Sequence, residues 1–213
     1  MFRILVICIL SFSLLGCQSA YYGAWEKLGV EKREILVDRV ENAKESQEDA
    51  QEQFASALEE LSSLIVFDGG DLQDIYEDLS DELARSEAAA EDVTSRVNKV
   101  DSVAQALFVE WEEEIQVFTN ATYKRESTKK LNETQRQYNG LMRSMRRVEK
   151  SMAPVLVTLK DNVLYLKHNL NANAIGALKG ELTSVKEDVN VLITEMNKAI
   201  EESNAFIESM ENQ

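Results

Sequence analysis

Residues 175–210 read IGALKGELTSVKEDVNVLITEMNKAIEESNAFIESM. Apolar or small side chains recur in this stretch at alternating intervals of three and four residues. This spacing places them on one face of an α-helix that packs against other helices, and no part of the stretch has the alternation of a β-strand. The seam consists of Ile175, Leu178, Leu182, Val185, Val189, Leu192, Met196, Ala199, Ser203, Phe206 and Met210.

The same spacing recurs in three earlier stretches, whose seams begin at Leu36, Leu72 and Leu131. Short connections between long helices make neighbouring helices run antiparallel. The sequence therefore predicts an all-α fold, an elongated antiparallel bundle or coiled coil of four long helices. One closed bundle and two separate hairpins both fit the pattern. The expected helices span residues 23–67, 72–118, 123–168 and 174–210, within one domain of residues 23–213.

Turn-forming residues separate the four runs. Asp68-Gly69-Gly70-Asp71 is the first break, because glycine permits positive φ and Asp71 is placed to cap the next helix. Thr and Asn gather at residues 119–122, and three Asn lie within residues 169–173. Pro154 falls inside the third run, where we expect a kink rather than an end, because the heptad continues on both sides.

Composition excludes several classes of function. The chain has 23 Lys and Arg against 38 Asp and Glu, which argues against nucleic-acid binding. Its two cysteines, Cys8 and Cys17, both lie near the start, so the body of the chain has no Cys nucleophile or Cys metal ligand. His168 is the single histidine, and no nucleophile motif or P-loop accompanies it. We expect no enzyme, no cofactor and no metal site, with a structural role for His168 near a helix end.

The N-terminus is typical of a secretory signal. Arg3 precedes an apolar run over residues 4–15, which is shorter than the roughly 20 residues of a spanning helix. The run ends in Leu-Leu-Gly-Cys17, which resembles the lipobox of bacterial lipoproteins. The resemblance implies a signal peptide over residues 1–16, lipidation of Cys17 and a membrane-anchored linker over residues 17–22.

Two other outcomes stay open for this segment. One is an ordinary signal with cleavage near Gly16 or Ala20, and the other is an uncleaved anchor. If Cys17 is lipidated, Gln18 rather than Asp at the next position resembles sorting to the outer membrane. The expected location is then the cell envelope, on the outer membrane and facing the periplasm.

A basic segment stands out in this acidic chain. Residues 124–150 hold nine Lys and Arg against three Glu. Folding the third helix back on the second brings Lys124, Arg125, Lys129 and Lys130 close to Glu110, Glu112, Glu113 and Glu114. Each such exposed pair contributes only about 0–1 kcal/mol to stability, so these pairs mainly select the register between the two helices. The basic segment either pairs with the acidic helices of the same chain or forms a docking surface for an acidic partner or anionic lipid.

The apolar run Leu64-Ile65-Val66-Phe67 precedes the first turn. Leu64 belongs to the seam of the first helix and is expected in the core. Ile65, Val66 and Phe67 either cap the end of the bundle or form a contact point for a partner, distant from Cys17.

Four stretches together resemble the bacterial domain of unknown function 2959 family. They are KREILVDRVE at residues 32–41, FDGGDL at 67–72, MAPVL at 152–156 and LKHNLNA at 166–172. The resemblance covers nearly all of the chain after the signal. It implies secreted or lipid-anchored helical proteins without an established activity, so it supplies no catalytic residue.

The function we expect is a non-enzymatic envelope lipoprotein that acts as a helical spacer or interaction scaffold in the periplasm. Its partners would be the membrane, through Cys17, and an unidentified envelope protein. The alternative is a periplasmic carrier that holds a hydrophobic ligand or lipid between its helices. A continuous apolar cavity would favour the carrier, and a filled core would favour the scaffold.

Overall fold

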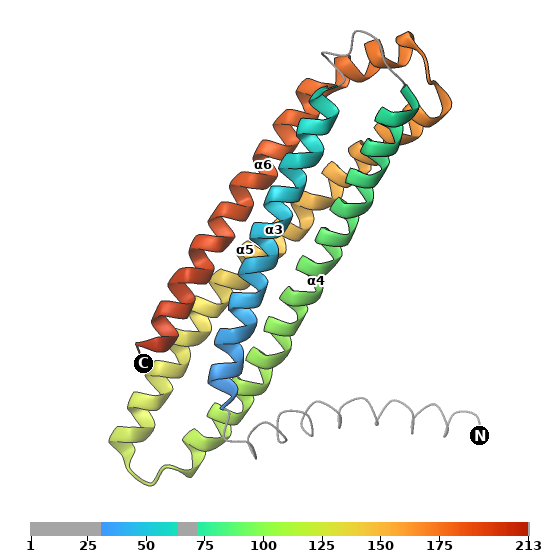
Figure 1. Cartoon of the computed structure of the whole chain (residues 1–213). Helices are drawn as coiled ribbons and strands as arrows, with labels where there is room; N and C mark the ends of the chain where they lie inside the picture. The colour runs from blue at the N-terminus through green and yellow to red at the C-terminus, as the bar shows by residue number, and fades with distance from the viewer. Residues whose placement is uncertain (1–30, 64–71, 213) are drawn as a thin grey trace, which may run out of the picture.

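The structure is a computed structural model that describes residues 31–63 and 72–212, without the side chains of residues 172–174. The predicted all-α bundle is confirmed, and none of these residues lies in a β-strand. Four long helices follow one another along the chain (Figure 1). They are α3 (Lys32–Ser63), α4 (Leu72–Val117), α5 (Ala121–His168) and α6 (Ala172–Glu211).

The helices form a closed ring rather than two separate hairpins. Each helix packs against the next along the chain, and α3 packs against α6, so the first and last helices are neighbours. Successive helices run in opposite directions, which gives an elongated up-down-up-down bundle (Figure 1). At 1.5 Å per residue, α4 and α5 are each about 70 Å long.

The predicted seams form the core along the axis of this ring. All eleven seam positions of α6 are buried, as are those of α3 from Leu36 to Leu61. The eleven seam positions of α5 are buried as well: Leu131, Thr134, Tyr138, Leu141, Met145, Val148, Met152, Val155, Leu159, Asn162 and Leu166. In α4 the seam is buried in its middle, whereas Leu72, Tyr76, Leu83 and Trp111 are half-buried. Burial of a large apolar side chain is worth about 1.5–3 kcal/mol, so this continuous seam is the main source of stability.

The described part of the expected first helix is α3, and residues 23–30 and 64–67 of that expectation lie outside the described residues. Glu31 precedes α3, and its carbonyl accepts the bond from the Ile35 amide at 3.2 Å. α5 begins two residues earlier than expected because Asn120 caps it, accepting from the amides of Thr122 at 2.9 Å and Tyr123 at 3.3 Å. α6 also begins two residues earlier.

Pro154 does not end α5, as expected from the heptad on either side of it. Its ring is exposed, and so is Lys150, whose carbonyl loses a helical donor to the proline. The Thr158 hydroxyl donates to the Pro154 carbonyl at 3.1 Å, one turn later.

A buried carboxylate joins α3 to α4. Glu82 accepts hydrogen bonds from Gln53 and, at 3.2 Å, from the Ser56 hydroxyl, both on α3, and pairs with Arg85 of its own helix at 2.6 Å. Burial by itself raises the pKa of Glu82, but the hydrogen bonds from Arg85 and Gln53 outweigh burial and lower it. The charge is therefore held ionised inside the α3–α4 interface.

One polar residue of the core has no such support. Gln47, the polar member of the first seam, is fully buried, and neither its Nε2 nor its Oε1 has a hydrogen-bond partner. A buried amide without partners destabilises the fold. In coiled coils, a single polar residue in the seam can fix the register and the number of helices, at a cost in stability. Gln47 suits this role.

Candidate functional site

The residues singled out from the sequence fall into two groups. Cys17 and the run Ile65, Val66 and Phe67 lie outside the described residues. The basic residues Lys124, Arg125, Lys129 and Lys130 lie in the first turns of α5, close to the turn that joins α4 to α5.

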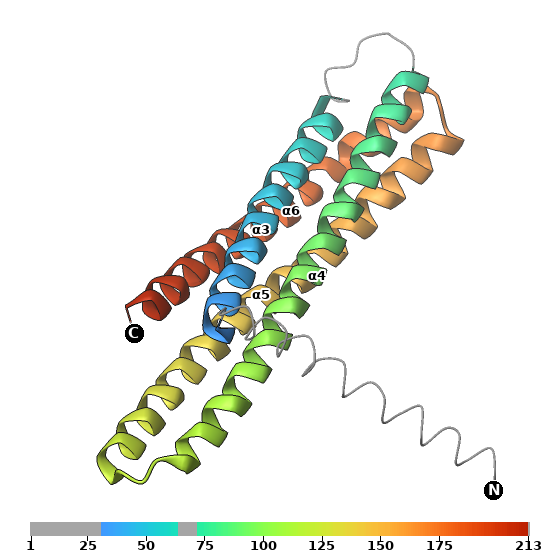
Figure 2. The same ribbon diagram turned by 60° about the horizontal axis from the view of Figure 1, so that its bottom comes forward.

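This turn forms one end of the molecule, which we call the α4–α5 tip and define as residues 115–125. The tip extends beyond the start of α3 and the end of α6 (Figures 1 and 2). Lys32, the first residue of α3, pairs with Glu110 at 2.9 Å, and α4 continues for seven residues past Glu110. The tip therefore reaches about 10 Å past the start of α3.

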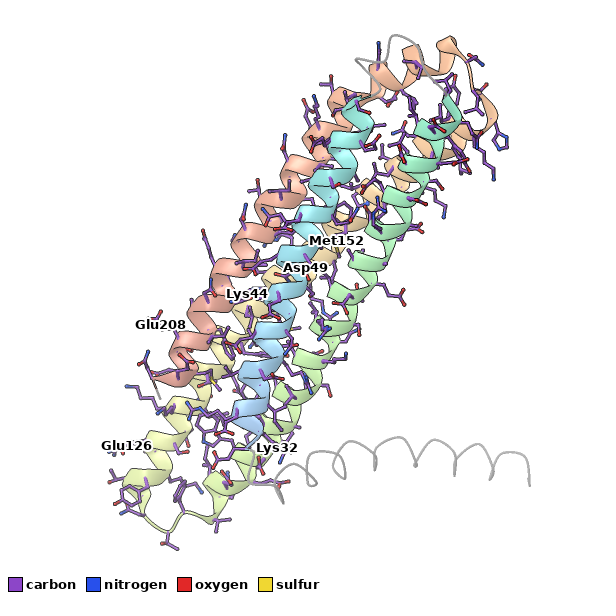
Figure 3. All side chains as sticks on the ribbon, in the orientation of Figure 1. Lys32, Lys44, Asp49, Glu126, Met152 and Glu208 are labelled. Atoms are coloured by element: carbon purple, nitrogen blue, oxygen red, sulfur yellow. The ribbon has the colours of Figure 1, made fainter. Side chains whose placement is uncertain are left out.

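The tip extends still farther past α6. Ser209, near the end of α6, donates a 2.8 Å hydrogen bond to Gln137 of α5. The first 16 residues of α5 lie beyond this contact, a length of about 24 Å. In Figure 3, Glu126 lies closer to the α4–α5 turn than Glu208 or Lys32 does.

Three large apolar side chains are exposed at the tip. Val117 is 79% exposed, Phe118 42% and Tyr123 59%. The rings of Phe118 and Tyr123 meet edge to face, with centroids 6.5 Å apart and planes at 71°. None of the three belongs to a predicted seam, so the heptad pattern did not single them out. The sequence could have pointed to these three residues only by their position, because they lie outside both seams and on either side of a turn.

The helix that leaves this turn has an unusual first turn. It contains no acidic residue, although Asp and Glu are favoured at a helix N-terminus, and Lys124 and Arg125 follow directly. Lys124 donates to Gln116 at 3.0 Å rather than to a glutamate. Residues 115–125 hold one Lys, one Arg and no Asp or Glu, in a chain of net charge −15.

The charge pairs farther along the hairpin only partly follow the sequence expectation. The start of α5 does lie against the end of α4, where the Trp111 indole N–H donates to the Ser127 hydroxyl at 2.9 Å. Lys129, however, lies 3.8 Å from Glu133 of its own helix, and Glu110 pairs with Lys32 of α3. α4 packs against both α3 and α5, so Glu110 has possible partners on either side, and the charge pattern did not indicate that it pairs with α3.

The opposite end of the bundle has its own exposed apolar residues. Leu164 and Tyr165 near the end of α5, and Leu170 in the turn to α6, are all exposed. A groove of about 540 Å³ between α5 and α6 lies beside Tyr165 and is also lined by Asn162. The Asn162 side chain is buried, and its Nδ2 has no hydrogen-bond partner.

Among the described residues, no group of three or more His, Asp or Glu side chains is placed to hold a metal ion. His168 is the last residue of α5 and is exposed there, at the helix end where the sequence placed it. None of the helices α3 to α6 is long and apolar enough to cross a membrane.

A family model described as "Protein of unknown function (DUF2959)" matches residues 21–210. The chain belongs to the DUF2959 family. The match covers α3, α4 and α5 completely and α6 up to its penultimate residue, so the whole four-helix ring is the family's fold unit in this DUF2959 protein. The family description names no activity and adds no residue to the site. No curated protein and no solved structure gives a significant match.

Proposed function

We propose that this DUF2959 protein is a non-enzymatic lipoprotein of the bacterial envelope, tethered to the outer membrane through Cys17 and acting as a rigid helical spacer or interaction scaffold in the periplasm. The proposal joins two parts of the chain. The first is the signal-like segment that ends in Leu-Leu-Gly-Cys17. The second is a bundle whose longest helices measure about 70 Å.

The filled core is the observation that carries the scaffold role. The seam positions of α5 and α6 are buried from Leu131 to Leu166 and from Ile175 to Met210, with side chains packed along the axis. A carrier for a lipid needs an apolar cavity large enough to enclose most of the ligand. Two grooves, one beside Glu87 and one beside Glu181, lie at the surface between adjacent helices and are lined in part by charged side chains.

The carrier remains the second candidate because of one observation. The groove between α5 and α6 has a volume typical of ligand sites, and Asn162, one of its lining residues, has a buried Nδ2 without a hydrogen-bond partner. Exposed Asp161 and Glu181 also line it, which suits a polar ligand better than a lipid tail. Native mass spectrometry of the protein purified from membranes tests this candidate, since a carrier would retain a ligand and a scaffold would not.

The tether is tested by Cys17→Ser in the full chain, with Cys8→Ser as the matched control. Cys8 lies inside the apolar run and is removed with the signal if Cys17 becomes the first mature residue. We expect the wild type and Cys8→Ser to sediment with outer membranes after a salt wash and to incorporate labelled palmitate. Cys17→Ser should do neither, while its circular dichroism stays helical. A Cys17→Ser protein that still sediments with membranes after the wash would overturn lipid tethering.

A further inference from the structure

The α4–α5 tip combines three features that point to one kind of partner. It is the outermost part of its end of the bundle, it exposes Val117, Phe118 and Tyr123, and it lacks acidic residues while carrying Lys124 and Arg125. Aromatic rings beside exposed aliphatic side chains suit the interface of a bilayer, where the apolar part enters and polar atoms stay wet. Lysine and arginine beside them suit anionic headgroups.

The path of the chain indicates which membrane this is. Helix α3 begins at the same end of the bundle as the tip, so the chain that precedes Lys32 enters there (Figure 1). Cys17 lies 15 residues before Lys32, and 15 residues span at most about 50 Å. A bilayer that holds a lipid on Cys17 therefore lies within reach of the tip rather than at the far end of a rod about 70 Å long.

The rest of the surface explains why the contact would be confined to the tip. The chain carries a net charge of −15, which repels an anionic membrane over most of its surface. The nearest acidic residues, Glu114 and Glu126, flank the tip on α4 and α5 and are exposed. Glu114 lies three residues before the end of α4 and Lys124 lies three residues after the start of α5, so the two are at similar depth. A molecule standing with the tip towards the bilayer therefore brings Val117, Phe118 and Tyr123 closest to it.

We propose that the α4–α5 tip is a second membrane contact, in which Val117, Phe118 and Tyr123 enter the interface of the bilayer that carries Cys17, and Lys124 and Arg125 bind the phosphates of its anionic phospholipids. This proposal rests on the proposed tether for its choice of membrane. The tip fixes the orientation of the rod, because the tip and the anchor at Cys17 hold the protein to the bilayer at two places.

Photocrosslinking in cells that express the full chain tests the contact. Phe118 is replaced by the photoreactive p-benzoylphenylalanine, and the matched control carries the same residue at Val191, which is 59% exposed on α6, away from the tip. We expect phospholipid adducts on the peptide that contains position 118, at a yield at least about tenfold above position 191, because an inserted apolar side chain favours the membrane by that factor. Equal yields at both positions would overturn the proposal.

A charge reversal tests the role of the basic residues. Arg125→Glu should lower the yield of lipid adducts at position 118 by at least about fivefold, because it replaces attraction to anionic headgroups with repulsion. Arg136→Glu is the control, since Arg136 is also exposed on α5 but lies 11 residues farther from the tip. Both variants should keep the wild-type melting temperature. An unchanged yield in Arg125→Glu would overturn headgroup binding at this position.

Fractionation of the same cells separates failure of the tip from failure of the tether. A wild-type chain that sediments with membranes but gives no lipid adduct at position 118 leaves the tether standing and overturns the tip contact. A wild-type chain in the soluble fraction overturns the tether, and without a lipid adduct it overturns the tip contact as well. Adducts between position 118 and a protein, in place of lipid, would overturn the membrane contact and identify the tip as a protein-binding surface.

Discussion

The Tyr138 hydroxyl donates a 2.6 Å hydrogen bond to Oδ1 of Asp101 and so joins α5 to α4. This bond lowers the pKa of Asp101 and outweighs partial burial, which acts in the opposite direction. Burial and the same bond raise the pKa of Tyr138 well above its usual value, so the phenol stays protonated and remains a donor. The Tyr138 ring also meets Phe108 of α4 edge to face, with centroids 5.3 Å apart.

Tyr138→Phe should keep the ring packing and lose only this bond. We expect the free energy of unfolding at neutral pH to fall by about 1 kcal/mol, below the roughly 1.5–3 kcal/mol of a bond to a charged group, because Asp101 is partly exposed. The pKa of Asp101 is lower in the folded state than in the unfolded one, so its stabilisation is present above about pH 4 and is lost as the pH falls through the folded pKa.

The difference between wild type and Tyr138→Phe should therefore shrink as the solution is acidified, in urea unfolding curves recorded from pH 7 downwards. Asp101→Asn is the control, because it keeps an acceptor for Tyr138 but removes the titrating group. If the wild type and Tyr138→Phe lose stability in parallel over the acid range, Tyr138 does not control the titration of Asp101.

Glu82→Ala should destabilise the bundle more than the same change at its exposed neighbour Asp81. The change leaves Gln53 and Ser56 of α3 without their shared acceptor, at an expected loss of about 1–3 kcal/mol. Asp81→Ala removes an exposed carboxylate one residue away and should change stability by less than about 0.5 kcal/mol. Chemical denaturation measures both. Similar losses in the two variants would show that Glu82 contributes only surface charge.

Gln47→Met should stabilise the protein. Methionine has a similar length and no polar group, so the substitution removes two buried atoms that lack partners, with an expected gain of about 1–3 kcal/mol. Gln47→Ala removes the same polar atoms but leaves a cavity and should destabilise instead. Thermal melting with size-exclusion chromatography detects both effects. A Gln47→Met protein that melts below the wild type would contradict the absence of a partner for Gln47.

The sequence predicted the core well because a buried seam leaves a periodic signal. From Leu131 to Leu166 and from Ile175 to Met210, every predicted seam residue is buried. The pattern missed a second set of buried residues, which lie beside the seam. In a closed ring each helix meets two neighbours, so the buried stripe is wider than the one a two-helix pattern reveals. The residues missed include Val103, Phe108, Ile115, Val163 and Ile207.

The sequence identified the basic half of the tip but not its apolar half. Lys124 and Arg125 stand out by charge, whereas Val117 and Phe118 look like the last turn of an ordinary helix. Their exposure follows from the different extents of the helices, since α3 begins and α6 ends short of the α4–α5 turn. Helix periodicity does not determine where neighbouring helices end relative to one another, so the overhang could not be predicted.

The contact between α3 and α6 also decides when the chain can fold. A ribosome releases α3 first and α6 last, and α6 covers one side of the α3 seam. Until all 40 residues of α6 have emerged, the apolar side of α3 that meets α6 has nothing to pack against. Synthesis halted before α6 thus leaves an incomplete ring that exposes apolar surface to chaperones and proteases, and the rod is completed only when the last helix closes it.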